Sequence, residues 1–395
     1  MKPEFDIERA RKETLACGNL IHFNNAGSSL MPVPVSEALH TYLRREEESG
    51  GYETAELYKE SLDQIYQSAA TLLNCRPHEI AYVENATRAW DLTFYSFTFR
   101  PGEKILTTLS EYGSNVVAYI QQAKRYGVDV VFVPNDPSGQ IDIDALSGLI
   151  DDRVKLISMT HIPTGGGLVN PAKEVGKIAG QAGIPFLLDA CQSVGQIPID
   201  VDEIGCDALC ITGRKYLRGP RGTGLLYIRD TLLDRLEPPI LDQHAAELIS
   251  PTAYRMRPDA RRFENWEQYV AGKYALAKAI DYALSWGLDS IQQRIYGLAD
   301  RLRKKLSEID GITLTDEGVE KCGIVTFISN RLSPPDIKAA LSRKRINVST
   351  SKGSGSLVSF RERGLEEVVR TSVHYFNTDE EIDYFAETLD RLTKR

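Results

Sequence analysis

The sequence predicts an α/β protein, in which a large domain with a mostly parallel seven-stranded sheet is followed by a smaller α+β carboxyl-terminal domain. Three observations carry this prediction. The chain has 395 residues, more than one ordinary hydrophobic core accommodates. Between Glu79 and Asp230, short apolar runs alternate with amphipathic segments, a pattern typical of βαβ units. After Trp286 the pattern changes to a charged helical stretch followed by short strands and helices.

The elements of the large domain follow from the length and period of each run. Short apolar runs bounded by turn residues predict strands at 80–84, 104–109, 128–133, 154–160, 186–189, 208–212 and 224–228. Helical periodicity predicts helices at 87–98, 114–126, 171–182 and 266–286.

The smaller domain is predicted from shorter and more mixed segments. A charged helix at 290–309 comes first, with strands expected at 324–328, 346–349 and 369–374 and helices at 335–344 and 379–393. We place the large domain at 20–286 and assign 1–19 together with 287–395 to the small domain.

Composition excludes several classes of protein. The formal net charge of −8 argues against a nucleic-acid-binding surface, and no apolar run reaches the length of a membrane span. The amino terminus is charged and has no apolar signal core, so we expect a cytoplasmic protein. The six cysteines are scattered and lack zinc-site spacing, which predicts reduced thiols and no metal site.

The most informative polar residues follow two of the predicted strands. Asp189 ends the strand at 186–189, Gln192 comes three residues later, and Lys215 follows the strand at 208–212 within a Gly-rich turn. Ligands of open α/β sheets bind beyond the carboxyl ends of the strands, so these groups are expected to face one crevice. Lys215 and Asp189 suit pyridoxal phosphate, because a lysine forms the Schiff base with this cofactor and a carboxylate holds its ring nitrogen protonated.

Each residue also has an ordinary alternative. Lysine in a polar turn is usually a solvated charge, Asp189 could be a strand-end turn residue, and Gln192 could be an exposed residue at a helix start. The combination favours the cofactor interpretation. Cationic neighbours such as Arg214 would lower the pKa of a buried Lys215 and so favour its free amine.

The segments DACQ and TGRKYLRGPRGTGLLY, with Asp189 and Lys215 separated by 26 positions, resemble the class V branch of fold-type I pyridoxal-phosphate enzymes. That branch includes cysteine desulfurases, selenocysteine lyases, isopenicillin N epimerases, kynureninases and hercynylcysteine sulfoxide lyases. The resemblance runs from the segment FNNAG to RTS near the carboxyl terminus. It implies a fold-type I transferase architecture and a homodimer with shared active sites.

The resemblance also implies roles for individual residues. Lys215, Asp189 and Tyr112 would be catalytic, with Tyr112 stacked on the cofactor ring where relatives carry histidine. Other implied cofactor contacts are Gln192, Ala86, Thr87, Arg88, Thr164, Thr212 and Arg214. The start of a helix at Ala86 suits a phosphate dianion, although Asn85-Ala86-Thr87 is equally an ordinary helix cap. Implied substrate contacts are Arg370, which would clamp a carboxylate, and Asn25, Ala26, Gly27 and Ser28.

Two departures from the desulfurases shape the functional hypothesis. The loop 348–356 contains no cysteine, and Ser354 stands in the nearest register to the desulfurase nucleophile. Arg214 replaces the histidine that usually precedes the Schiff-base lysine. The motifs are closest to sulfoxide-lyase and epimerase-like members, so we expect a C–S lyase acting on a cysteine S-conjugate or its sulfoxide. An epimerase, an aminotransferase and a decarboxylating variant share the same site, and a non-catalytic binding protein is the alternative from another class.

Overall fold

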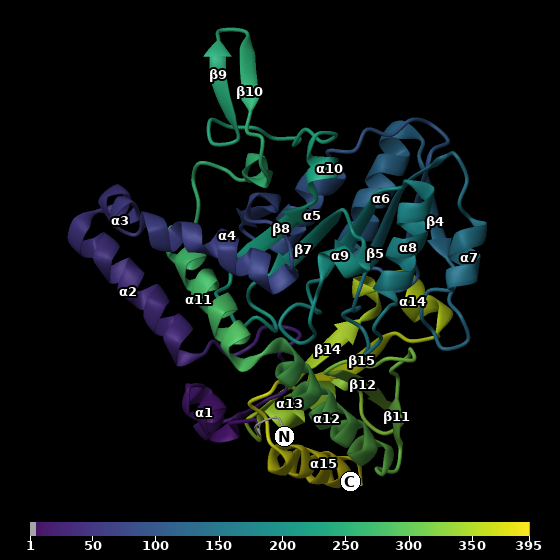
Figure 1. Cartoon of the computed structure of the whole chain (residues 1–395). Helices are drawn as coiled ribbons and strands as arrows, with labels where there is room; N and C mark the ends of the chain where they lie inside the picture. Colours follow the sequence, from purple (N-terminus) through teal and green to yellow (C-terminus); the bar gives the residue numbers. More distant parts are fainter. Residues whose placement is uncertain (1–4, 395) are drawn as a thin grey trace.

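The computed structural model describes residues 5–394, and its centre is a seven-stranded sheet (Figure 1). The strand order is β2-β8-β7-β6-β5-β3-β4, and every strand is parallel to its neighbours except β8, which pairs antiparallel with both β2 and β7. The strands are β2 (Ile80–Val83), β3 (Lys104–Thr108), β4 (Asp129–Val133), β5 (Val154–Thr160), β6 (Phe186–Asp189), β7 (Ala208–Thr212) and β8 (Gly224–Ile228). The predicted fold class is confirmed, and the predicted bounds of each strand of this sheet lie within one residue of the observed ones.

Helices cover both faces of this sheet (Figure 1). Helix α8 illustrates how the sequence specifies them, because its buried residues Ala172, Val175, Gly176 and Ala179 recur at helical spacing. It ends at Gly183, whose φ of 66° is left-handed. The helices of this region are α5 (Ala86–Phe94), α6 (Gly113–Tyr126), α7 (Ile143–Gly148), α8 (Ala172–Ala182), α9 (Val201–Ile204), α10 (Asp230–Leu233) and α11 (Val270–Trp286).

Several short elements were not predicted, namely Ile143–Gly148, Val201–Ile204, Asp230–Leu233, Ile312–Leu314 and Leu357–Glu362. Two larger parts of the chain were also not predicted. One is a set of amino-terminal helices, and the other is the hairpin of β9 (Ala246–Ser250) and β10 (Ala253–Met256), which projects from the body as α2 and α3 do (Figure 1). Leu248 and Ile249 in this hairpin are more than half exposed, so its strands lack the inward apolar face from which strands are recognised. The amino-terminal elements are α1 (Ile7–Lys12), β1 (Ile21–His22), α2 (Val33–Ser49), α3 (Gly51–Leu57) and α4 (Lys59–Leu73).

The carboxyl-terminal part is built on a four-stranded antiparallel sheet with the order β11-β12-β15-β14. The single strand expected at 346–349 is two strands, because β13 pairs with β1 near the amino terminus while β14 pairs with β15. The division at residues 19 and 286 stays a prediction. The elements are α12 (Leu288–Ser307), β11 (Ile312–Leu314), β12 (Ile324–Ser329), α13 (Pro334–Ser342), β13 (Ile346–Asn347), β14 (Ser349–Lys352), α14 (Leu357–Glu362), β15 (Glu367–Ser372) and α15 (Asp379–Thr393).

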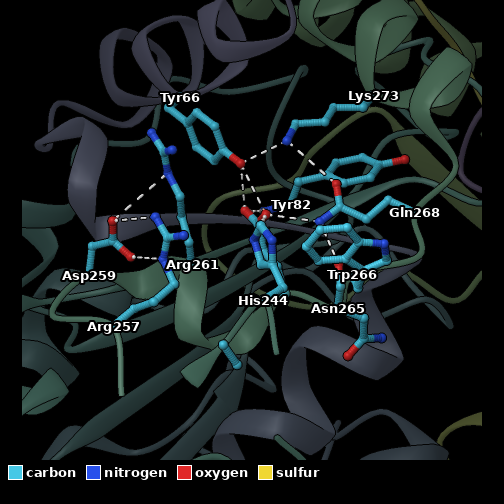
Figure 2. Close-up of polar contacts among 12 residues, drawn as sticks. Tyr66, Tyr82, His244, Arg257, Asp259, Arg261, Asn265, Trp266, Gln268 and Lys273 are labelled. Carbon is cyan, nitrogen blue, oxygen red and sulfur yellow. Dashed lines mark hydrogen bonds and ion pairs between the residues drawn. The ribbon is translucent and has the colours of Figure 1, made fainter. Parts of the chain in front are cut away.

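A buried carboxylate, Glu264, attaches the segment before α11 to the edge of the large sheet, and Figure 2 labels the residues that bond to it. Its oxygens accept hydrogen bonds from Tyr66 Oη at 2.8 Å, from the backbone N–H of Tyr82 at 2.8 Å and from Gln268 Nε2 at 3.0 Å. Lys273 Nζ donates to the same Tyr66 hydroxyl at 2.8 Å. Helices α4 and α11 and strand β2 therefore meet at one polar group, next to the residues that lead into α5.

Burial raises the pKa of Glu264, but the hydrogen bond from His244, the charge of Lys273 and the bonds from Tyr82 and Tyr66 outweigh it, so the pKa lies below its ordinary value. The Glu264→Ala variant should lose about 3–5 kcal/mol of unfolding free energy, because it leaves the Lys273 cation buried without its counter-charge. Urea titration of the two proteins measures the difference.

The same measurement against pH tests the ionisation. A lowered pKa means that the stabilisation by Glu264 is complete above about pH 4.5 and is lost as the pH falls through the lowered value, so the difference between the two proteins should shrink below that point. Glu247→Ala is the control, because Glu247 and Arg255 form an ion pair with both side chains more than half exposed. Its effect should stay within about 0.5 kcal/mol. An equal loss in both variants would contradict this account.

Candidate functional site

A cavity of about 210 Å³ lies beyond the carboxyl ends of β5, β6 and β7, next to the starts of α5 and α6. Most of the residues predicted from the sequence meet there, although they come from segments far apart in the chain. The cavity is lined by Asn85, Ala86, Thr87, Tyr112, Thr160, Ile162, Thr164, Asp189, Cys191, Gln192, Thr212, Arg214 and Lys215.

Asp189 ends β6 and is buried at the floor of this cavity. Its Oδ1 accepts the backbone N–H of Cys191 at 3.0 Å, and its Oδ2 accepts from Asn115 Nδ2 at 3.4 Å. Each carboxylate oxygen keeps capacity for a further hydrogen bond, since a carboxylate offers about four lone-pair positions. The group can therefore hold a protonated ring nitrogen.

Lys215 lies in the turn that follows β7. Burial is the main cause that lowers the pKa of its amine, and the nearby cations Arg214 and Arg370 lower it further, against the opposing effects of Cys191 and Asp189. A lowered pKa favours the unprotonated amine, the form that reacts with an aldehyde.

The turn is held by a buried arginine that the sequence analysis did not select. Arg218 has a φ of 60° and donates to Leu30 O at 2.8 Å, to Tyr375 Oη at 2.7 Å and to Thr14 Oγ1 at 2.5 Å. Its guanidinium also lies 4.6 Å from the ring centroid of Phe376. Three residues after Lys215, the turn is thus bonded to both the amino-terminal and carboxyl-terminal segments. In the sequence, Arg218 is one of several basic residues in a turn, and nothing local distinguishes it.

In the side-chain amide of Gln192, one polar atom has a hydrogen-bond partner in the protein and the other has none. Its Nε2 donates to Ala26 O at 3.0 Å, while Oε1 is buried and has no hydrogen-bond partner in the protein. Buried polar atoms are almost always paired in folded proteins, so an orphaned amide oxygen facing a cavity indicates a bound donor. This arrangement fits the predicted contact with a cofactor hydroxyl.

The first turn of α5 borders the cavity with Ala86 and Thr87. The Asn85 side chain caps the helix by accepting the Arg88 N–H at 2.9 Å, so that amide is already paired. Arg88 also does not line the cavity, unlike Ala86 and Thr87. The free N–H groups of the first turn and the positive end of the helix dipole suit a phosphate, while Arg88 fits that role less well than the sequence analysis expected.

Thr164 and Tyr112 line the cavity, whereas Arg370 contacts Thr164 but is not among the lining residues. Arg370 Nη1 donates to both the carbonyl oxygen and the hydroxyl of Thr164, and its Nε is buried without a partner. Burial lowers the pKa of Arg370 to about 10. An unpaired buried guanidinium N–H suits an anionic ligand, as expected of a carboxylate clamp. Tyr112 is 37% exposed and lines the cavity as predicted.

The predicted substrate contacts at 25–28 lie behind the cavity and not among its lining residues. Asn25 Nδ2 donates to Ser372 O at 2.7 Å, which fixes this segment to β15. Ala26 O accepts from Gln192, Gly27 O accepts from Arg214, and Ser28 O bonds His22. The segment therefore orients cofactor-facing side chains through its carbonyl groups, a role that side-chain patterns do not reveal.

The serine-rich loop, residues 349–356, begins with β14 and packs against the rim of the cavity. A Cβ added to Gly113, next to Tyr112, would lie 2.7 Å from Ser354 O, and one added to Gly355 would lie 3.9 Å from Thr164. Ser354 thus lies beside Gly113, the residue after Tyr112, and Gly355 lies beside the lining residue Thr164, so the loop adjoins the cavity.

Four lining residues are not among the predicted contacts, namely Asn85, Thr160, Ile162 and Cys191. Cys191 lies between Asp189 and Gln192 in the sequence, so its position was available as a signal. Its Sγ, the Cys210 Sγ and a carboxylate oxygen of Asp189 lie within 4.8 Å of one another. Burial raises the pKa of the Cys210 thiol, which favours the protonated form over a metal-binding thiolate.

The donor set fits pyridoxal phosphate. The cavity offers an amine with a lowered pKa, a buried carboxylate, an orphaned amide oxygen and the start of a helix. Close packing against Gly224 fixes the start of α5. A Cβ on Gly224 would lie 2.7 Å from Ile211 O and 2.9 Å from the Asn85 carbonyl carbon. Lys215, Asp189, Gln192 and the first turn of α5 would hold the cofactor, which supplies an electron-accepting ring conjugated to the substrate Cα.

Comparison with known proteins agrees with this fit. The model of the family "Aminotransferase class-V" matches residues 21–385. A probable cysteine desulfurase of Pyrococcus abyssi is 28% identical over 98% of both chains, and one of Xylella fastidiosa is 30% identical over 95% of this chain and 91% of its own. A solved apo cysteine desulfurase of Thermococcus onnurineus has a TM-score of 0.91 at 27% identity, covering 100% of this chain and 99% of its own. No helix in the described part of the chain combines the length and apolar character that crossing a bilayer requires.

The close approach at Gly224 gives a direct test of the phosphate end. Gly224→Ala should displace Asn85 and the first turn of α5, and so weaken binding of pyridoxal phosphate by about tenfold or more, since the added methyl meets backbone on both sides. Equilibrium binding followed by absorbance measures the change. Gly180→Ala in α8 is the matched control, because nothing lies within 4 Å of its added Cβ, and cofactor affinity should be unchanged. Equal affinity in both variants would refute the role given to α5.

Proposed function

Because the chain belongs to the class-V aminotransferase family, we propose that it uses pyridoxal phosphate to cleave the C–S bond of a cysteine S-conjugate or its sulfoxide. In the thioether case, the conjugate and water give a thiol, pyruvate and ammonia. The observation that carries this proposal is the loop from Ser349 to Ser356, which adjoins the cavity and contains no cysteine. The motifs of the chain resemble those of hercynylcysteine sulfoxide lyases and isopenicillin N epimerases, and this resemblance supports the same proposed reaction.

The chemistry assigned to the residues follows from their surroundings. The unprotonated Lys215 amine, once free, would take the proton from the substrate Cα, because burial favours its neutral form. Asp189 would keep a proton on the ring nitrogen, and Tyr112 would cover one ring face. Arg370 would bind the α-carboxylate through its unpaired N–H. The thiolate or sulfenate then leaves from Cβ and needs no acceptor on the protein.

The relatives described as probable cysteine desulfurases also suggest cleavage at sulfur, but of cysteine itself. A desulfurase transfers the sulfur atom to a cysteine thiolate, and serine cannot carry a persulfide. Ser354 in this loop therefore disfavours desulfurase activity.

The substrate range distinguishes the alternatives. The purified holoenzyme should release pyruvate, ammonia and thiol in equal amounts from cysteine S-conjugates, and Lys215→Ala should release none. Alanine and sulfide from L-cysteine would instead identify a desulfurase. Deuterium exchange at Cα without pyruvate would indicate an epimerase, and a keto acid formed with transfer of the amino group would indicate an aminotransferase.

Arg370 gives a prediction on substrate binding. Arg370→Gln should raise KM by about 10- to 100-fold, the loss expected for a charged hydrogen-bonded pair. Arg370→Lys should recover only part of this loss, because the ammonium cannot form the bidentate contact. Steady-state kinetics with one S-conjugate measures both effects. Arg391→Gln is the control, because Arg391 lies in an ion pair with both side chains more than half exposed, and its KM should not change.

We further propose that the protein acts as a homodimer. Tyr52 and Leu57 in α3 and Trp266 before α11 are large apolar side chains that are each more than 60% exposed, and a partner chain would cover them. Helices α2 and α3 project from the body, as expected of an element that packs on another chain (Figure 1).

A further inference from the structure

Glu111 is a buried carboxylate that the proposed reaction does not use. It follows β3, is 1% exposed and lies outside the residues that line the cavity. Its oxygens accept hydrogen bonds from the hydroxyls of Thr107 and Thr160, the backbone N–H groups of Tyr112 and Thr160, and Asn115 Nδ2. A polar group with five donors is costly to assemble in a core, and such a site calls for a function.

The donors connect Glu111 to the cofactor-facing residues. Asn115 Nδ2 lies 2.9 Å from Glu111 Oε1 and 3.4 Å from Asp189 Oδ2, so one amide bridges two buried carboxylates. Thr160 and Tyr112, which donate to the same group, both line the cavity. Glu111 therefore contacts the neighbours of the cofactor position from behind.

We infer that Glu111 is a positioning residue whose carboxylate, joined to Asp189 through Asn115, sets the charge beside the ring-nitrogen position and couples cofactor affinity to pH. A protonated ring nitrogen held by Asp189 is stabilised by a second negative charge behind it. Binding of the cofactor therefore favours ionised Glu111, and ionised Glu111 favours binding, because the linkage is reciprocal. The inference concerns cofactor binding and holds whichever reaction follows.

The surroundings of Glu111 support ionisation near neutral pH. Burial raises its pKa, the Thr160 hydroxyl lowers it and the charge of Asp189 raises it, with a result of about 7. Other titratable groups that face it are Tyr119 in α6 and Cys210 in β7, both with pKa values raised by burial and therefore neutral. When Glu111 is protonated, the hydroxyl of Thr107 or Thr160 can turn to accept its proton, because hydroxyls both donate and accept.

The test compares the dissociation constant of pyridoxal phosphate in the wild type and in Glu111→Gln between pH 5.5 and 9. The ratio of the variant's constant to that of the wild type should rise on the order of tenfold as the pH passes through about 7, corresponding to one pKa unit of coupling. Titration of the free cofactor and of Lys215 affects both proteins and largely cancels in this ratio.

Thr107→Val provides a second test that a merely structural residue would not satisfy. It removes one hydroxyl donor from Glu111 while keeping the shape of the side chain, and Thr107 does not line the cavity. The loss of a donor should raise the pKa of Glu111 and move the inflection of cofactor affinity to higher pH. This variant keeps the inference testable if Glu111→Gln does not fold.

The control is Glu264→Gln, a second buried carboxylate, which lies outside the cavity lining. It should lower stability but leave the ratio flat with pH. The inference is overturned if the ratio for Glu111→Gln is also flat, or if Thr107→Val leaves the inflection where it is in the wild type.

Discussion

The chemistry of the cavity depends on lowering the pKa of a lysine amine inside a protein that also buries carboxylates nearby. Asp189 would by itself raise the pKa of Lys215, and burial and two arginines counteract it. One of those arginines, Arg214, precedes Lys215 in the same turn, and the other, Arg370, comes from β15. The lowered pKa of the lysine therefore depends mainly on burial and in part on a charge supplied by the carboxyl-terminal sheet.

This dependence explains why the turn after β7 is bonded so extensively. Arg218 attaches it to Thr14, Leu30 and Tyr375, and the carbonyl oxygen of Tyr216 lies 3.0 Å from His374 Nε2. The residues on both sides of Lys215 are thus held by segments near the two ends of the chain. Glu264 anchors the β2 edge of the same sheet through the Tyr82 N–H, and the next residue, Asn265, bonds Glu84 just before α5. Tyr82 and Asn265 are labelled in Figure 2.

The sequence predicted those features that depend on local pattern. The strands of the large sheet have short apolar runs and clear turn signals, so their bounds were predicted within one residue, and the groups following β6 and β7 were expected at one edge. Features that depend on tertiary bonds were missed. Arg218, Glu111 and the carbonyl groups at 26–28 are unremarkable in sequence, and their roles come from partners over a hundred positions away or from five donors meeting at one carboxylate. The hairpin β9–β10 was missed because its side chains are largely exposed.

Under the proposed function, the serine-rich loop 349–356 is where this chain departs from the cysteine desulfurases while keeping their fold. The cofactor end of the site depends on strand ends, a helix start and buried charges that the whole sheet maintains, so changes there would disturb the fold itself. The loop between β14 and α14 contributes few of these contacts and touches the cavity rim through Ser354 and Gly355. Replacement of a nucleophilic thiol in this loop therefore costs little stability, while it removes the acceptor that sulfur transfer requires. The steps at the substrate Cα depend on the cofactor end of the site, which stays the same across such a family. A change in the loop can therefore alter which group leaves the substrate Cβ.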